Sequence, residues 1–335
     1  MTRIFTEGFE TGDNLFWNVA GDSTSLTGPR SGLRCLSLGN NGVLTKTITA
    51  VSEAYFRIPV KITSAIINQV TQRFLVLSGA TSMVSFTNVQ SITPTHLTAQ
   101  VGASTVATGT TWIFVNVWYL VEIYIKIADS GGRIVVKVDG ITDIDYTGDT
   151  KPSTETTFDT IQLFSGAASS ASWDDIAMND TAGSVDNSWC GDGHVVRLNP
   201  NAVGSSSQWI PLSGSTNYLM VDEVPPDGDT TYVSASVVNL FDLYKVSGSS
   251  TISASPITIS RLWVEARAKD SSSSGCYISV GLKSGSTTLW GGSQVLLGNY
   301  TTTNFKTSEY LVDIDSGLPW TGSMINLLEC GIKAV

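Results

Sequence analysis

Acidic side chains gather at two places in the sequence where their spacing suggests chemistry. The first group is Asp139, Asp143, Asp145 and Asp149, and carboxylate oxygens are the ligands that Ca²⁺ prefers. The group lacks the glycine and the terminal glutamate of an EF-hand loop, so a solvated hairpin is the simpler interpretation. We therefore expect no cofactor, and Ca²⁺ stays open as an alternative.

The adjacent pair Asp174-Asp175 is the second candidate, because two carboxylates carry out glycoside hydrolysis. Neighbouring strand residues point to opposite faces, so the pair cannot converge on one bond. We expect one of the two to be buried and hydrogen-bonded and the other to be exposed. His96 and His194 accompany no G-x-S-x-G or HExxH motif. The sequence therefore predicts no catalytic residue and a chain that is not an enzyme.

The elements that carry these residues are expected to be strands. Ile134, Val136 and Val138 alternate with polar residues, Asp139-Gly140 is a two-residue turn signal, and a returning strand follows. The run Trp112–Ile127 is long enough for a helix, but its β-branched and aromatic content favours strands. Pro59 indicates an edge strand or a bulge.

Three short motifs in this region follow one another in a recognisable order. They are Val136–Gly140 (VKVDG), Phe158–Leu163 (FDTIQL) and Trp173–Met178 (WDDIAM). Their order and spacing resemble the closing half of a concanavalin A-like (laminin G-like) jelly roll, and the likeness extends over residues 4–180. The resemblance implies a β-sandwich that can bind glycans, although such a fold does not define a function.

Composition limits the remaining classes of protein. The chain has 335 residues, of which 41% are hydrophobic and 14% charged, with a net charge of −10, which fits two or three strand-rich domains. It has no basic cluster and no long apolar run, so we expect no nucleic-acid partner and no membrane span. The N-terminus lacks an apolar signal region, which predicts synthesis in the cytoplasm. The four cysteines are expected to be free, buried thiols.

The small polar residues Asn179–Asn187 predict a domain edge. We expect an all-β chain with three parts: a concanavalin A-like jelly roll over residues 1–180, a linker and anchoring segment over 181–245, and a second β-sandwich over 246–335. One short helical turn is expected at Thr321–Leu328.

The segment Ser188–Tyr244 and the C-terminal residues Pro319–Lys333 resemble a second family, the virion proteins of tailed bacteriophages. The first match includes Trp189-x-Gly191-Asp192 and the run Val221-Asp222-Glu223, and the second reads PWTGSMINLLECGIK. This resemblance implies a structural subunit of a virion, such as a decoration, spike or tail-associated protein.

Two hypotheses about function follow. The first is a non-enzymatic virion component that assembles with itself and with capsid or tail proteins and whose outer jelly roll has an additional role in binding a host glycan. Its assembly interface is expected to be built from the aromatic residues of the linker, because aromatics dominate interface cores: Trp189, Trp209, Tyr218, Tyr232 and Phe241. The alternative is a glycan-binding lectin or glycan-active enzyme that uses the jelly-roll face. Of the nine Trp residues, we expect one or two to be exposed and available to stack on a sugar.

Overall fold

The computed structural model forms two compact units, residues 1–197 and 198–335, and each is described by itself. The structure describes residues 3–14, 16–18, 24–25, 28–39, 41–64, 71–79, 82–89, 96–165, 170–246, 258–271, 275–292, 294–296, 298 and 301–335. The segment expected as a separate linker, 181–245, is divided between the units: residues 181–197 belong to the first and residues 198–245 to the second.

The first unit is built from strands alone among its described residues. They are β1 (Arg3–Glu7), β2 (Thr24–Ser25), β3 (Cys35–Leu38), β4 (Val43–Val51), β5 (Glu53–Ser64), β6 (Thr71–Ser78), β7 (Ser82–Val89), β8 (Leu97–Val101), β9 (Ser104–Thr108), β10 (Trp118–Lys126), β11 (Gly132–Val138), β12 (Ile141–Gly148), β13 (Phe158–Phe164), β14 (Ser170–Trp173) and β15 (Ile176–Asn179).

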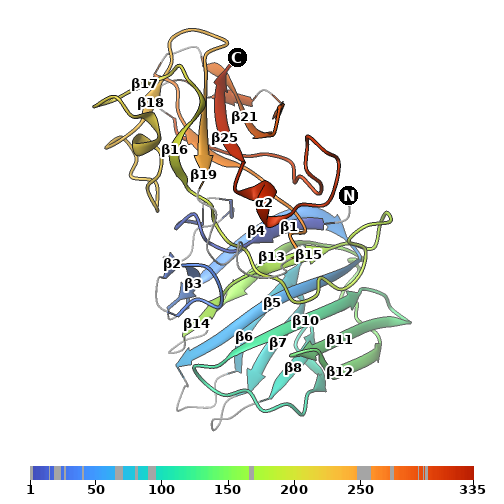
Figure 1. Ribbon diagram of the computed structural model, residues 1–335. Helices are drawn as coiled ribbons and strands as arrows, with labels where there is room; N and C mark the ends of the chain where they lie inside the picture. The colour runs from blue at the N-terminus through green and yellow to red at the C-terminus, as the bar shows by residue number, and fades with distance from the viewer. Residues whose placement is uncertain are drawn as a thin grey trace. The chain divides into compact units, whose positions relative to one another are not determined.

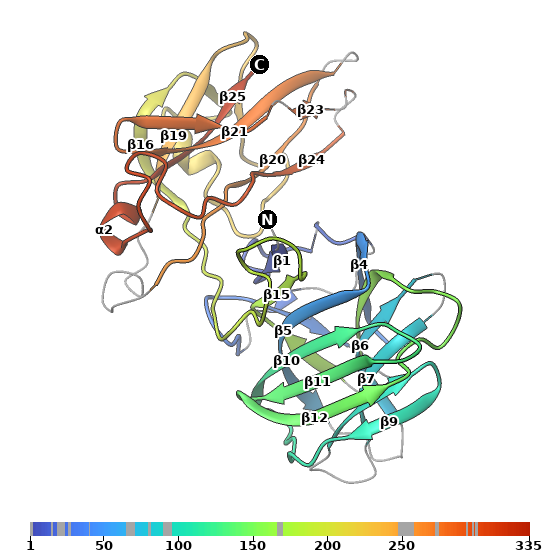
Figure 2. The ribbon, with the colours of Figure 1, turned by 90° about the vertical axis from the view of Figure 1, so that its right-hand side faces the viewer.

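These strands form two antiparallel sheets that stack face to face (Figures 1 and 2). The large sheet has the order β12-β11-β10-β5-β14-β3-β2, and β15 joins it beside β5 and pairs in turn with β1. The second sheet has the order β4-β13-β6-β7-β8-β9. Each sheet joins a run of sequence neighbours, β12-β11-β10 or β6-β7-β8-β9, to strands that are distant in sequence, as in β5-β14 and β4-β13. Such crossovers are expected for a jelly-roll β-sandwich. The predicted fold class is confirmed.

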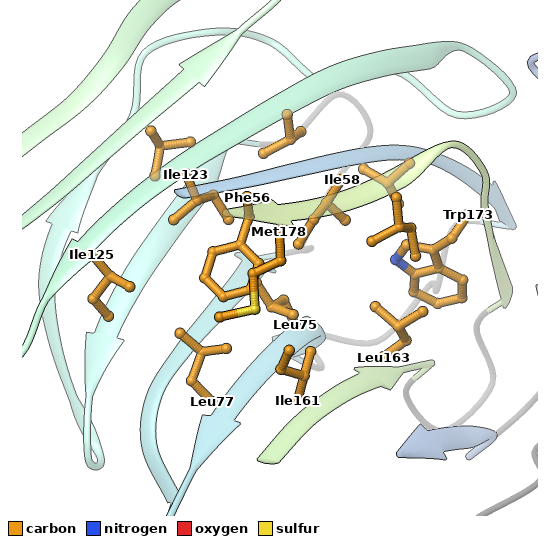
Figure 3. Packing of buried hydrophobic residues seen from close by; sticks show 14 of the residues in the cluster. Phe56, Ile58, Leu75, Leu77, Ile123, Ile125, Ile161, Leu163, Trp173 and Met178 are labelled. Carbon is orange, nitrogen blue, oxygen red and sulfur yellow. The ribbon is translucent and has the colours of Figure 1, made fainter. Parts of the chain in front are cut away.

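The core lies between the two sheets because each strand alternates apolar and polar residues. Figure 3 shows Phe56, Ile58 and Ile123 of the large sheet facing Leu77 and Leu163 of the second sheet. The central side chains are fully buried, Trp173 among them. Each strand of the large sheet therefore presents its other set of side chains on the opposite face, which we call the outer face.

The predicted β11–β12 hairpin is confirmed. Val138 pairs with Ile141, and the turn residues Asp139 and Gly140 both have positive φ, 50° and 82°. Two positive φ values give the tight turn whose twist matches a hairpin. Only the second part of the apolar run 112–127 is a strand, β10, and residues 109–117 form the loop that leads into it.

The strand expected at Trp173–Met178 is interrupted by Asp174-Asp175, which separate β14 from β15. Asp175 has a φ of 50°, so the alternation of faces breaks at this point. Both side chains are fully buried, and the expectation that one of them would be exposed is wrong. Pro59 lies in β5 opposite this interruption, where Asp174 N donates to its carbonyl oxygen at 3.4 Å. The missing N–H of the proline therefore faces a gap between two partner strands.

The second unit is also almost entirely β. Its elements are β16 (Pro200–Ser207), β17 (Ile210–Pro211), the 3₁₀-helix η1 (Asn217–Met220), β18 (Val233–Ser234), β19 (Phe241–Val246), β20 (Glu265–Ala268), β21 (Cys276–Ser284), β22 (Thr287–Trp290), β23 (Gln294–Leu296), β24 (Thr303–Lys306), α2 (Gly322–Ile325) and β25 (Glu329–Ala334).

Its main sheet has the order β16-β19-β25-β21-β22, with β23 beside β21, and the β20-β24 pair forms a smaller sheet. Two apolar clusters line these sheets, one around Trp320 and Ile325 and one around Ile278 and Phe305. The predicted helical turn near the C-terminus is confirmed as α2, which Thr321 caps by accepting the N–H of Met324 at 3.3 Å.

All four cysteines are free, as predicted, but only Cys35 is buried. Its burial raises the pKa of its thiol to about 11. No helix in the described part of the chain is long and apolar enough to cross a membrane.

Candidate functional site

The outer face of the large sheet carries aromatic and charged side chains in cross-strand rows. In one row Arg57 of β5 lies opposite Glu122 of β10, which in turn lies opposite Lys137 of β11. In the next row Tyr55 lies opposite Tyr124, with ring centroids 4.7 Å apart. Such a mixture of aromatic and charged groups on one sheet face is what the alternative hypothesis, a lectin or glycan-active protein, requires.

The chain itself covers part of this face with residues 188–195, which we call the strap. Trp189 lies edge-on against Tyr55 at 5.3 Å between ring centroids, and Lys137 Nζ lies 3.8 Å from the Trp189 ring centroid. Gly191 N donates to Glu122 Oε1 at 3.1 Å, and Arg57 Nη1 donates to Gly191 O at 3.4 Å. The strap therefore occupies the hydrogen-bonding groups at the middle of the face.

One end of the strap is held by a group that we call the Asp175 cluster: Arg30, Ser31, Asp175, His194 and Val195. The buried Asp175 carboxylate accepts Val195 N at 2.7 Å and Ser31 Oγ at 2.8 Å. It also lies 2.9 Å from Arg30 Nη1 and 3.2 Å from His194 Nδ1. These contacts join the loop before β3, the β14–β15 interruption and the strap.

Asp174 adds a second buried carboxylate beside the cluster. It accepts the backbone N–H of Arg30 at 2.8 Å and of Ser31 at 3.2 Å. Burial, and then the neighbouring Asp175, raise the pKa of Asp174 to about 8. Burial has the opposite effect on a base: it lowers the pKa of Arg57, and the nearby Asp175 only partly offsets this shift. Both carboxyl groups are fully buried, and their hydrogen bonds hold loops together.

The four hairpin aspartates do not converge. Asp145 pairs with Arg133 at 2.9 Å, and Asp139 Oδ1 accepts Leu120 N at 2.8 Å. Asp149 and Asp143 bond to other backbone N–H groups. Within the described ranges, no three His, Cys, Asp or Glu side chains lie close enough together to hold a metal ion.

A second surface lies where the β9–β10 loop meets the β11–β12 hairpin, and we call it the Trp112 surface. Its members share high exposure: Trp112 53%, Phe114 50%, Val117 43% and Ile141 71%. Trp112 is the single exposed tryptophan of the nine, all of which the structure describes. The expectation of one or two exposed tryptophans is confirmed.

The loop that presents Trp112 is held firmly. Asp143 Oδ1 accepts the N–H groups of Thr110 and Thr111, each at 2.8 Å. Tyr119 hydroxyl accepts the N–H of Phe114 at 3.0 Å. The His96 ring lies 4.0 Å from the Trp112 ring. The indole is therefore fixed on one side and open on the other, which lowers the entropy lost when a ligand binds.

The five aromatic residues of the predicted assembly interface fall in both units. Trp189 belongs to the first unit and lies in the strap, whereas the other four belong to the second unit. Trp209 Nε1 donates to Leu240 O at 3.0 Å, and Phe241 packs edge-on against Trp290 at 5.7 Å. Tyr218 is half-buried in η1, and Tyr232 is 41% exposed.

Sequence reasoning missed the Trp112 surface and the strap. Trp112 stands at the start of the most apolar run in the chain, which favoured a buried position. A detectable signal was the polar run 108–111 before it, which is typical of a loop. The strap pairs Trp189 with Tyr55 across a long stretch of chain, and no local pattern predicts such a contact.

No protein-family model matches the chain, and no curated protein matches it either. Solved structures of similar fold include "Cellulose induced protein, Cip1" at 12% identity and a TM-score of 0.43, covering 56% of this chain and 100% of that one. An endo-β-1,4-glucuronan lyase from the fungus Trichoderma reesei matches at 12% identity, a TM-score of 0.39 and the same coverage of 56% and 100%. A sialidase matches at 12% identity and a TM-score of 0.41 over 54% of this chain, which spans only 18% of the sialidase.

These similarities concern the fold alone, and the β-sandwich itself is defined by the two stacked sheets of the first unit. Alginate lyases are also among the neighbours, at 11–14% identity. The prediction of a chain that is not an enzyme is contradicted: an alginate lyase and a glucuronan lyase are among the solved structures of similar fold.

Proposed function

We propose that the chain recognises a polysaccharide and that the Trp112 surface of the first unit makes the contact. The single observation that carries this proposal is the exposed indole of Trp112, half open to solvent and fixed by His96 and by the bonded loop beneath it. An aromatic face packs well against the C–H groups of a sugar ring.

Polar groups surround the exposed aromatic side chains. Asn116 and Asp139 are exposed beside them, and both have positive φ, 61° and 50°. Sugar hydroxyls need such donors and acceptors next to a stacking ring. A purely apolar patch would instead favour a protein partner, so the mixture favours carbohydrate.

The test is affinity electrophoresis of the full chain through gels that contain alginate, a glucuronan or a neutral glucan. We expect at least one polysaccharide to retard the native protein. Trp112→Ala should weaken that binding about tenfold, the effect of losing about 1.4 kcal/mol at a central aromatic contact. Leu33→Ala is the matched control, because Leu33 is 70% exposed elsewhere on the first unit. Equal retardation of native protein and Trp112→Ala would contradict the proposal.

We also propose that the second unit attaches the chain to a tailed-phage virion, either as a homo-oligomer or on capsid or tail proteins. The observation that favours this is a group of exposed apolar side chains within residues 209–238: Ile210 65%, Leu212 47%, Leu219 47%, Tyr232 41%, Val237 59% and Val238 60%. Several of them are neighbours, because Ile210 pairs with Ser234 and Leu212 N donates to Tyr232 O at 2.9 Å. Adjacent exposed apolar side chains are typical of an interaction surface.

The assembly proposal is tested with the double variant Ile210→Ser, Tyr232→Ser of the full chain. We expect it to lose oligomers in light scattering and to be absent from purified particles. Leu327→Ser is the control, because Leu327 is 74% exposed but lies outside this segment. A double variant that still enters particles would contradict the assignment.

A further inference from the structure

The strap covers side chains that a ligand could use. Arg57 and Glu122 are charged, yet only 5% and 6% exposed, and the neutral backbone of Gly191 bonds to both. Arg57 and Glu122 lie opposite each other, and Arg57 Nε also donates to the Asp175 carbonyl oxygen at 2.6 Å. The strap itself offers this pair only neutral backbone groups. Sugar hydroxyls can donate and accept in place of the Gly191 backbone, and sugar carboxylates add a negative charge that can pair with Arg57, so an acidic sugar could replace the strap.

Trp189 occupies a place suited to a sugar ring. Its ring centroid lies 5.3 Å from that of Tyr55, 6.5 Å from that of Tyr124 and 3.8 Å from the Lys137 ammonium. Without Trp189, the paired tyrosine rings and the lysine would face solvent together. Aromatic rings pack against the C–H groups of sugar rings, and charged groups beside them can bond to the polar groups of the sugar.

The strap is held on the sheet by individual hydrogen bonds, such as Asn179 Nδ2 to Ser188 O at 2.7 Å, and not by strand pairing. Residues 188–195 contain no strand, and residues 181–185 before them are exposed. Val195 is the one buried residue of the strap, with 8% of its surface exposed. Segments with few buried apolar contacts open at lower free energy than the core does. The Asp175 cluster is the main polar attachment of this end.

The charge that remains after opening indicates the ligand. Removing the strap also removes Asp192, which pairs with Arg30. Opening therefore removes one negative charge from a face that carries Arg30, Arg57 and Lys137 as well as Glu122, the buried Asp175 and Glu53, which accepts the Tyr124 hydroxyl. We propose that the strap is a displaceable internal occupant of the outer face, and that its release exposes a second binding surface for an anionic polysaccharide. This inference rests on the proposed function of the first unit.

The experiment measures alginate binding by the full chain for native protein, Trp189→Ala and Asp175→Asn, with hydrogen exchange of residues 188–195 as the readout of strap opening. Both variants should expose the strap amides and lower the apparent Kd for alginate about tenfold, because more of the chain is competent to bind. The gain should shrink in high salt.

The same variants in a Trp112→Ala background separate the two proposals. If the tenfold gain in alginate affinity persists in that background, the second surface binds independently of the Trp112 surface. This result would support the inference even if Trp112→Ala alone leaves polysaccharide binding unchanged. Should the strap amides become exposed while alginate binding stays unchanged or weakens, the inference is overturned. Amides that stay protected in both variants overturn it too. If Asp175→Asn does not fold, Trp189→Ala decides the matter, since it leaves the Asp175 cluster intact.

Discussion

Replacing Asp175 tests how strongly a buried carboxylate joins the parts of the first unit. Asp175 is fully buried, and Arg30, its ion-pair partner at 2.9 Å, has a side chain only 12% exposed. In Asp175→Asn the charge disappears, and an amide N–H₂ faces the donors of Arg30 and His194. Asparagine tolerates the positive φ of this position, so the change isolates the charge.

The magnitude follows from the groups left without a partner. Removing one member of a buried ion pair costs about 3–5 kcal/mol. Arg30 keeps Asp192 as a second partner, so we expect the lower end, about 3 kcal/mol. For a unit of this size that is a fall of about 6–12 °C in Tm. Asp175→Ala should be worse by about 1–2 kcal/mol, because alanine is strained at positive φ.

The assay is thermal and urea unfolding followed by circular dichroism, with hydrogen exchange at Val195 and Ser31 to locate the change. The control is Asp145→Asn, whose partner Arg133 is 49% exposed, and for which we expect no measurable change. If Asp175→Asn unfolds within 1 °C of the native protein and exchange at Val195 is unaltered, the cluster does not hold the strap.

Three further predictions concern pH, sterics and thiol reactivity. The pKa of Asp174 is raised to about 8 from an ordinary 3.8, so the folded state keeps a proton that the unfolded chain loses. Tm should therefore fall as pH rises from about 4 through about 8. In Asp174→Asn the dependence of Tm on pH should disappear, and a dependence equal to that of the native protein would exclude Asp174 as its cause. Gly109→Ala places a methyl group against Asp143 Oδ2, so it should lower Tm and weaken polysaccharide binding, and unchanged binding would show that the loop adapts. A thiol reagent should label the exposed Cys276 in native protein and Cys35 only after unfolding; early labelling of Cys35 would contradict its burial.

Much of the fold could be predicted because local rules and tertiary packing agree there. The Asp139-Gly140 turn, the alternating strands around it and the helical turn after Thr321 each follow from their own residues. Pro59 indicated an edge strand or a bulge, and it lies in an internal strand opposite an interruption. A single sequence does not show which partner strand will be broken, so the position of the gap could not be predicted.

The candidate site was harder to predict because it depends on contacts between distant residues. The alternation rule placed Asp174 and Asp175 on opposite faces, and it failed because Asp175 leaves the extended conformation. That departure is stabilised by Arg30 and by the strap, both remote in sequence. The burial of two adjacent aspartates thus depends on the assembled sheet and three loops. The alternation of apolar and polar residues along the sequence does not predict it.

The two surfaces of the first unit differ in a way that bears on how the chain meets a polymer. Trp112 is exposed and its loop is fixed by Asp143 and Tyr119, so it needs no rearrangement before it binds. In our proposal the outer face binds only after the strap leaves, so its apparent affinity is reduced in proportion to the fraction of chains that are open. A polysaccharide caught at Trp112 would raise the local concentration of sugar at the outer face and so favour strap release. A long polysaccharide should therefore gain affinity over an oligosaccharide in the native protein by much more than in Trp112→Ala, and equal gains in both would show that the two surfaces act separately.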